Sequence, residues 1–191
     1  MSPTTILHIL NDIVINNRQH IIEFGSGMST LYIAKLIQTN RLTASFYSVE
    51  SDKDWMDKMK SDLKNHHLED VVTFIYAPLT EVPSQLGLSD QKLWYDTKSI
   101  DKVLNNHTVD LIIVDGPLGK STPYARYSAV PFIINRLEKK YSVFLDDFKR
   151  PDELVILEEW SKLLNEKPKR NKRHAYFTTN KDYSTKPFKV N

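Results

Sequence analysis

Ile21-Ile22-Glu23-Phe24-Gly25-Ser26-Gly27-Met28-Ser29-Thr30 is the most informative segment of the chain, since a short apolar run ends in an acid and a Gly-x-Gly turn. Gly25 and Gly27 lack a Cβ atom, so the main chain can turn sharply there and approach a ligand closely. Ser29 and Thr30 stand at the start of the expected helix, where their hydroxyls can donate to a ligand. The segment predicts the first βα unit of a nucleotide-binding fold, and an ordinary strand-to-helix turn is the alternative.

Five strand-like runs alternate with stretches of helical apolar spacing, at residues 19–24, 44–50, 71–77, 110–115 and 141–146. This alternation predicts a parallel sheet with helices on both faces. Two further runs, 174–179 and 185–190, flank a short polar turn and predict a C-terminal hairpin. The expected fold class is α/β, with a doubly wound, mostly parallel seven-stranded sheet and an antiparallel C-terminal hairpin.

The length of 191 residues fits one domain, which we expect to span residues 1–191. Residues 1–18 are expected to form a leading helix that begins at Ser2-Pro3. Residues 78–107 are the one long irregular stretch and a candidate lid or substrate wall; the alternative is a surface excursion with Trp94 anchored in the core.

The composition excludes several classes of protein. The chain has no cysteine, which excludes disulfides, thiol nucleophiles and cysteine-based metal sites. It has no apolar run long enough for a membrane helix and no secretion signal, so we expect a cytoplasmic protein without a membrane partner. The net charge is +2 and the basic cluster at residues 167–173 has no interleaved aromatics, so we expect a solvated loop there and no nucleic-acid partner.

Glu50 closes the second predicted strand, at roughly the 20-residue offset from the glycine turn where an acid binds ribose hydroxyls. A carboxylate accepts both hydroxyl protons of a ribose and repels a 2′-phosphate. Glu50 therefore predicts a ligand that contains an unsubstituted ribose; the alternative is a surface acid at a strand end.

Three more acids, Asp115, Asp146 and Asp147, follow the fourth and fifth predicted strands. In an open α/β sheet these strand ends face the same crevice as Glu50. Converging carboxylates repel each other unless a cation compensates. The sequence leaves two solutions open: a divalent metal such as Mg or Mn, or ion pairs with Arg126 or Arg150.

The segment Glu23-x-Gly25-x-Gly27, together with Glu50, Asp115 and the terminal strand pair, resembles a class I S-adenosylmethionine-dependent methyltransferase with a Rossmann-like domain. The resemblance implies that Gly25 and Gly27 pass the methionine moiety, that Glu50 holds the ribose, and that Asp115 lies beside the methyl donor. It also implies that Glu23 fixes the glycine loop.

Asp115 with Asp146-Asp147 is similar to the metal triad of catechol-type O-methyltransferases, although the last position there is Asn. A shorter similarity, through Asp115-Gly116-Pro117 and the spacing of Asp147, Arg150 and Glu153, links the chain to methyltransferases that act on wall polysaccharides.

These observations predict a methyltransferase that uses S-adenosylmethionine and methylates an oxygen of a small molecule or saccharide. Asp115 is the expected base, with a metal at Asp115, Asp146 and Asp147 as the other way to activate the hydroxyl. Tyr124, Arg126, Tyr127 and Arg150 are the expected substrate residues, of which the first three could also be helix residues packed on the sheet. The alternatives are a nicotinamide-dependent oxidoreductase, disfavoured by Thr30 at the third glycine position, and a non-catalytic nucleotide-binding module.

Overall fold

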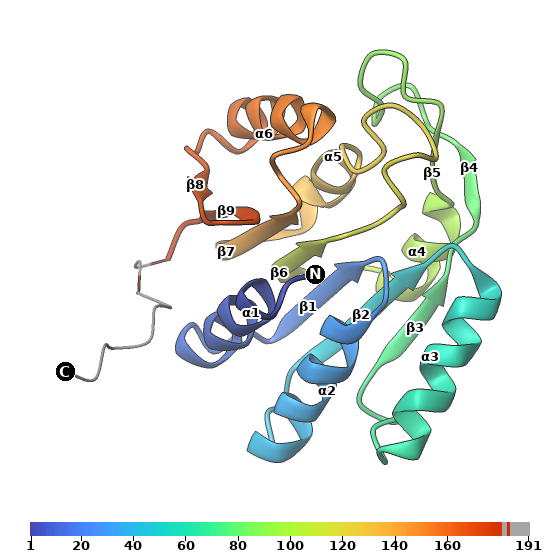
Figure 1. The fold of residues 1–191 in the computed structure, drawn as a ribbon, viewed down its shortest axis with the longest axis vertical. Helices are drawn as coiled ribbons and strands as arrows, with labels where there is room; N and C mark the ends of the chain where they lie inside the picture. The colour runs from blue at the N-terminus through green and yellow to red at the C-terminus, as the bar shows by residue number, and fades with distance from the viewer. Residues whose placement is uncertain (181–182, 184–191) are drawn as a thin grey trace.

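The computed structural model describes residues 1–180 and 183. Within them, the centre is a seven-stranded sheet with the order β3-β2-β1-β6-β7-β9-β8 (Figure 1). The first five strands in this order run parallel, whereas β9 is antiparallel to both β7 and β8. The strands are β1 His20–Phe24, β2 Ser45–Glu50, β3 Thr73–Tyr76, β6 Val109–Val114, β7 Leu137–Asp146, β8 Lys169–Arg170 and β9 His174–Thr178.

The predicted α/β class is confirmed: the sheet is mostly parallel, has seven strands and ends in an antiparallel pair. The pair is composed of β8 and β9, so Lys169–Arg170 of the basic cluster form a strand where the sequence predicted only a loop. The run 185–190, predicted as the last strand, lies outside the described residues.

The central strands β1 and β6 are buried on both faces because helices cover both (Figure 1). Ile21 packs in a cluster with residues of α1, α2 and α3, while its neighbour Ile22 points to the opposite face and to α4, α5 and α6. Successive side chains of a strand alternate between faces, so one strand serves two cores. The helices are α1 Pro3–Ile15, α2 Met28–Asn40, α3 Lys53–Asn65, α4 Thr97–Leu104, α5 Ala129–Ile133 and α6 Pro151–Leu164, with the 3-10 turn η1 Ile134–Arg136 after α5.

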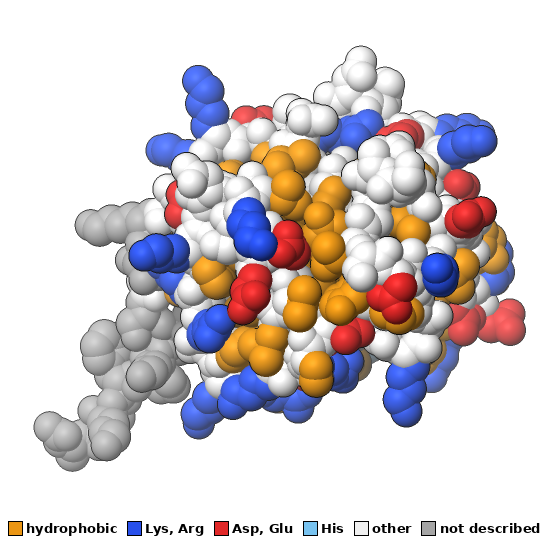
Figure 2. All heavy atoms as spheres, turned by 90° about the horizontal axis from the view of Figure 1, so that it is seen from above, with side chains coloured by type: hydrophobic (Ala, Val, Ile, Leu, Met, Phe, Trp, Pro, Cys, Tyr) orange, Lys and Arg blue, Asp and Glu red, His pale blue; other side chains and the backbone are white. Residues whose placement is uncertain are grey.

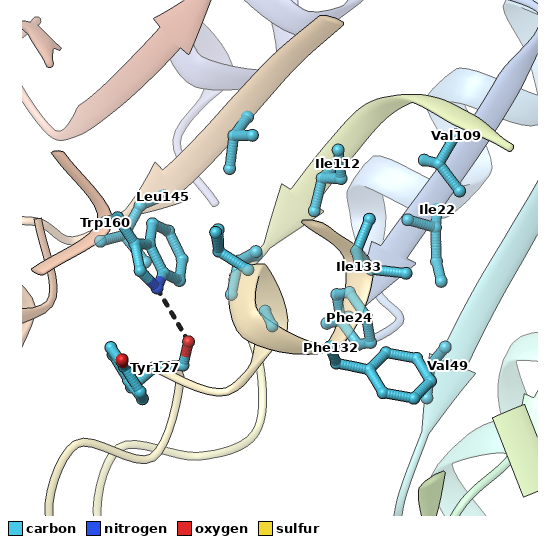
Figure 3. Close-up of a cluster of buried hydrophobic side chains, with 14 of the residues drawn as sticks. Ile22, Phe24, Val49, Val109, Ile112, Tyr127, Phe132, Ile133, Leu145 and Trp160 are labelled. Atoms are coloured by element: carbon cyan, nitrogen blue, oxygen red, sulfur yellow. Dashed lines mark hydrogen bonds between the residues drawn. The ribbon is translucent and has the colours of Figure 1, made fainter. Parts of the chain in front are cut away.

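Trp160 anchors α6 to the sheet (Figure 3). Its indole is fully buried beside Leu145 of β7, and its Nε1 donates to the carbonyl oxygen of Tyr127 at 2.8 Å. Burying a large side chain of this kind contributes about 1.5–3 kcal/mol, and the hydrogen bond satisfies its one polar atom. Trp160 therefore fixes the position of α6, and with it the turn between β7 and α6, relative to the sheet.

The segment 78–107 forms regular structure: β4 Leu79–Glu81 pairs antiparallel with β5 Leu93–Tyr95, and α4 follows. Trp94 is fully buried, with its ring centroid 5.5 Å from Phe24 and 5.2 Å from Phe132. This aromatic contact fixes the neighbouring Tyr95 at the carboxyl edge of the sheet.

The winding of the chain determines where a ligand can bind. From β1 the chain moves outward to β2 and β3, then crosses back to β6 on the other side of β1. At such a reversal the loops leave two adjacent strands in opposite directions, so a crevice opens at their carboxyl ends. No helix among the described residues is long and apolar enough to cross a membrane.

Candidate active site

A cleft of about 470 Å³ opens at the carboxyl ends of β1, β2, β6 and β7. Figure 2 shows the molecule from above, with hydrophobic side chains across the middle of this face and acidic and basic side chains beside them. The lining includes six of the predicted site residues, namely Gly25, Glu50, Asp115, Arg126, Asp147 and Arg150. It also includes Trp55 and Gly116, for which the sequence analysis predicted no role, and Tyr95, which belongs to the candidate substrate wall at residues 78–107.

Gly25 is required by close packing of two main-chain turns. Its φ is +92°, and a Cβ atom added there would lie 2.7 Å from the amide nitrogen of Gly116. Hydrogen bonds join the two turns, since the amides of Asp115 and Gly116 donate to the carbonyl of Phe24 at 3.0 and 2.7 Å, while the Gly25 amide donates to the carbonyl of Val49 in β2 at 2.9 Å. Gly116 is the counterpart of Gly25, since a Cβ there would meet the Tyr95 hydroxyl and the Gly25 Cα. The cleft floor is therefore bare main chain.

Gly27 has a different environment. Its main chain is extended, which any residue can adopt, and no atom lies within 4 Å of an added Cβ. Its amide donates to Thr30 Oγ1 at 2.8 Å at the start of α2. The protein itself does not need a glycine here, and the open space beside the main chain is available to a ligand.

Glu23 stabilises the glycine turn through hydrogen bonds to the start of α2, on the buried side of the turn. It is fully buried and accepts hydrogen bonds from the hydroxyls of Ser29, Thr30 (2.5 Å) and Ser48 (3.0 Å). Burial raises the pKa of Glu23 to about 7, against the lowering effect of the three hydroxyls. Ser29 and Thr30, predicted to donate to the ligand, thus donate inward and do not line the cleft.

Glu50 lies at the rim, largely buried, with donors on both oxygens. Oε2 accepts from the amide and hydroxyl of Ser26 at 3.1 and 2.9 Å, and Oε1 accepts from the amides of Ser51 and Asp52 at 2.7 and 2.9 Å. The Trp55 indole donates to the Ser26 carbonyl at 3.0 Å and forms the adjacent wall. The carboxylate is held in one orientation at the mouth of the cleft.

Asp115 faces the cleft from the end of β6. Its Oδ1 lies 3.2 Å from Arg126 Nη2, and its Oδ2 lies 3.1 Å from the amino group of Met1. The buried guanidinium of Arg126 also donates to the carbonyls of Asp115 (2.5 Å) and Asp146 (3.0 Å). Arg126 therefore joins the ends of β6 and β7. Despite these contacts, 26% of the Asp115 side chain remains exposed.

Asp146 and Asp147 diverge. Asp146 is buried toward α1, where it accepts from the Thr5 hydroxyl at 3.2 Å; burial and the nearby Asp115 charge raise its pKa. Asp147 has φ +53° and pairs with Arg150 at 2.5 Å and with Arg173. Burial alone would raise the pKa of Asp147, but the two guanidiniums outweigh it and the pKa is lowered.

The three acids do not fit a metal. Asp146 does not line the cleft, and Asp115 and Asp147 each have a guanidinium partner. No three His, Cys, Asp or Glu side chains of residues 1–180 and 183 are placed to hold a metal ion. Of the two solutions that the sequence left open, the geometry matches ion pairs, because Asp115 pairs with Arg126, and Asp147 pairs with Arg150 and Arg173.

The predicted substrate residues separate into two groups. Arg126 and Arg150 line the cleft, and Arg150 leaves half of its side chain exposed. Tyr127 lies in the hydrophobic core below Trp160, and Tyr124 packs against that core with its amide bonded to Asp152 at 3.1 Å. Neither tyrosine lines the cleft, since the segment after β6 folds back onto the sheet.

Tyr95 is the aromatic residue that lines the cleft on this side. Burial and the neighbouring acid Glu50 raise its pKa well above the ordinary value. Its hydroxyl therefore stays neutral and can donate a hydrogen bond to a bound group. The sequence predicted residues 78–107 as a candidate substrate wall but did not single out Tyr95, because the position of this residue depends on the pairing of β5 with β4.

Comparison with known proteins agrees with this geometry. The family model described as a methyltransferase domain matches residues 22–148. No curated protein matches the chain.

Several solved structures share the fold at low sequence identity. A candidate caffeoyl-CoA O-methyltransferase from Staphylococcus aureus is 14% identical, with a TM-score of 0.69 over 94% of this chain and 85% of that one. An O-methyltransferase from Bacillus cereus in complex with SAH is 14% identical, with a TM-score of 0.64 over 94% and 82%. The O-methyltransferase TomG from Streptomyces achromogenes, in complex with SAM, is 11% identical, with a TM-score of 0.63 over 94% and 82%.

Proposed function

We propose that this chain, which belongs to the methyltransferase-domain family and is a class I S-adenosylmethionine-dependent methyltransferase, methylates an oxygen atom of a small molecule or a saccharide. The observation that supports this proposal is the cleft at the winding reversal, which combines a bare main-chain floor, an oriented rim carboxylate and an accessible acid. Family membership favours a methyl donor over the nicotinamide alternative.

The cofactor-binding half of the cleft is the turn 25–27 with Glu50. The open space beside Gly27 gives a ligand access to the main chain, and Gly25 lets the turn pass directly over Gly116. Glu50 is oriented to accept the hydroxyl protons of a ribose, with the Trp55 ring as the adjacent wall. When bound, S-adenosylmethionine supplies a methyl group on a positively charged sulfur.

Asp115 is the base that we assign to the acceptor. In the overall reaction the acceptor oxygen gains the methyl group and loses its proton, and the sulfur keeps the electron pair of the broken bond. Asp115 accepts that proton, and Arg126 holds its carboxylate in place. The contribution of the protein is to orient the two reactants in line and to remove one proton.

A non-catalytic nucleotide-binding module would meet two conditions. Its strand-end acids would all be held in ion pairs, and there would be no cavity beside the site of the methyl donor. The first condition is met, since Asp115 and Asp147 have ion-pair partners. The second is not, since both residues line a cleft of about 470 Å³.

The experiment is calorimetry with S-adenosylhomocysteine and, separately, with NAD. We expect only the first to bind, and we expect Glu50→Gln to weaken it by about tenfold or more, because hydrogen bonds to a charged acceptor contribute roughly 1.5–3 kcal/mol. Asp57→Asn, an exposed change on α3, is the matched control and should bind like the wild type. Binding of NAD alone would overturn the proposal.

A further inference from the structure

A second hollow of about 220 Å³ adjoins the cleft. It shares Asp147 and Arg150 with the cleft, and Lys149, Lys172 and Arg173 complete its lining. Four of these five side chains are cationic. The hollow is therefore a basic extension of the same depression, on the side away from Glu50.

Two turns build this hollow. Lys149 and Arg150 lie between β7 and α6, and Lys172 and Arg173 lie between β8 and β9. The amide of Phe148 donates to the carbonyl of Arg173 at 3.3 Å, which ties the turns together. All four basic side chains are exposed.

Asp147 is the acid that organises these cations. It takes Arg150 on one oxygen and Arg173 on the other, so it holds two guanidiniums side by side. Within the described part of the chain, no carboxylate pairs with Lys149 or Lys172. The hollow keeps an excess of positive charge together with two oriented guanidinium groups.

The two ends of the depression differ in charge. The cofactor end is lined by Glu50 and Asp52, which suits a ligand with a positively charged sulfonium. The basic end repels such a ligand and attracts an anion. A guanidinium pair with flanking ammonium groups matches the several oxygens and the double charge of a phosphate better than a single carboxylate.

We propose, on the basis of the proposed function, that the methyl acceptor carries a phosphate group, which binds to Arg150, Arg173, Lys149 and Lys172 while the acceptor hydroxyl lies at Asp115. Arg150 lines both the cleft and the hollow, so one acceptor can reach both. The hollow is small and none of its lining residues is aromatic, so it lacks the stacking surface of a single-stranded nucleic-acid site.

Pyrophosphate is the probe, titrated calorimetrically into protein saturated with S-adenosylhomocysteine. We expect binding to the wild type that weakens roughly tenfold in the Lys149→Ala/Lys172→Ala double variant, because two charge-assisted contacts are removed. The control is Lys60→Ala/Lys64→Ala, which removes the same charge from α3, in a separate hollow, and should bind like the wild type.

Acetate and a short single-stranded RNA are the competing probes. Equal binding of acetate, tighter binding of the RNA, or equal weakening in both double variants would overturn the assignment. A protein that binds S-adenosylhomocysteine but not pyrophosphate would refute the phosphate site alone, whereas a protein that does not bind S-adenosylhomocysteine would refute the proposed function.

Methyl transfer to sugars and phenols, each with and without a phosphate, completes the test. We expect the phosphorylated form to be the better acceptor, and a preference for the unphosphorylated form would count against the proposal.

Discussion

The carboxylates around β1 and β2 and those after β6 and β7 are held in different ways. Among the residues that the structure describes, Glu23 and Glu50 accept only from hydroxyls and main-chain amides, whereas Asp115 and Asp147 are held by guanidinium groups. At Glu50, neutral donors fix the direction of the carboxylate and leave its charge uncompensated, whereas guanidiniums both fix and neutralise Asp115 and Asp147. The first region is therefore suited to a cationic cofactor, and the second brings cations to the acceptor side.

The largest effect expected from this comparison concerns Asp115. Asp115→Asn should lower kcat by roughly 10²- to 10⁴-fold, the usual contribution of a general base, as measured by release of S-adenosylhomocysteine with a hydroxyl acceptor. Asp101→Asn, an exposed partner of Arg136, is the control and should leave kcat unchanged. If Asp115 were only an ion-pair partner, its variant would lose stability and keep its turnover.

Gly25 and Gly27 give the next largest effect. Gly25→Ala should destabilise the protein by about 3 kcal/mol or more, because a positive φ and a backbone overlap with Gly116 act together. Gly27→Ala should cost under about 1 kcal/mol, since it changes only a helix N-cap. Urea unfolding measures both, and equal losses would show that the two glycines do not have separate roles.

Glu23 gives the smallest of the three effects. Its folded pKa of about 7 lies above the ordinary 4.5, so the folded state holds a proton that the unfolded state has lost between these values. Glu23 should therefore lower the free energy of unfolding by about 1–3 kcal/mol as the pH rises from about 4.5 through 7, and the change should level off at about pH 8. Glu23→Gln removes this dependence.

The measurement is the difference in urea midpoint between Glu23→Gln and the wild type at pH 5, 6, 7 and 8. The difference is needed because His174, whose pKa burial lowers to about 4, acts in the opposite direction. A difference that does not vary with pH would contradict the assignment to Glu23.

Apolar runs and the glycine turn predicted much of the fold, because the burial of a strand and the shape of a tight turn each depend on residues that are close in sequence. The apolar runs of β1 and β6 predicted buried parallel strands, since a sheet covered on both faces needs apolar side chains at successive positions. The glycine turn and Glu50 were predicted at the cleft by the same logic, because strand ends and their spacing are properties of a single βαβ unit.

The acceptor side was predicted less well because it depends on long-range contacts. The position of Tyr127 is decided by Trp160, and that of Tyr95 by the pairing of β5 with β4. The sequence could place Asp146 and Asp147 after one strand, but not the direction of each side chain. That direction depends on Thr5 of α1 and on Arg173 of the β8–β9 turn, which are distant along the chain.

The amino-acid sequence by itself determined the α/β class, the mostly parallel pairing of the strands and the residues at the glycine turn, because each depends on backbone preferences and apolar periodicity within a short stretch. Only the tertiary structure decided which charges compensate Asp115 and Asp147, which tyrosine lines the cleft, and that a basic hollow adjoins it. Those outcomes follow from electrostatic and packing contacts between segments that come together only when the chain folds.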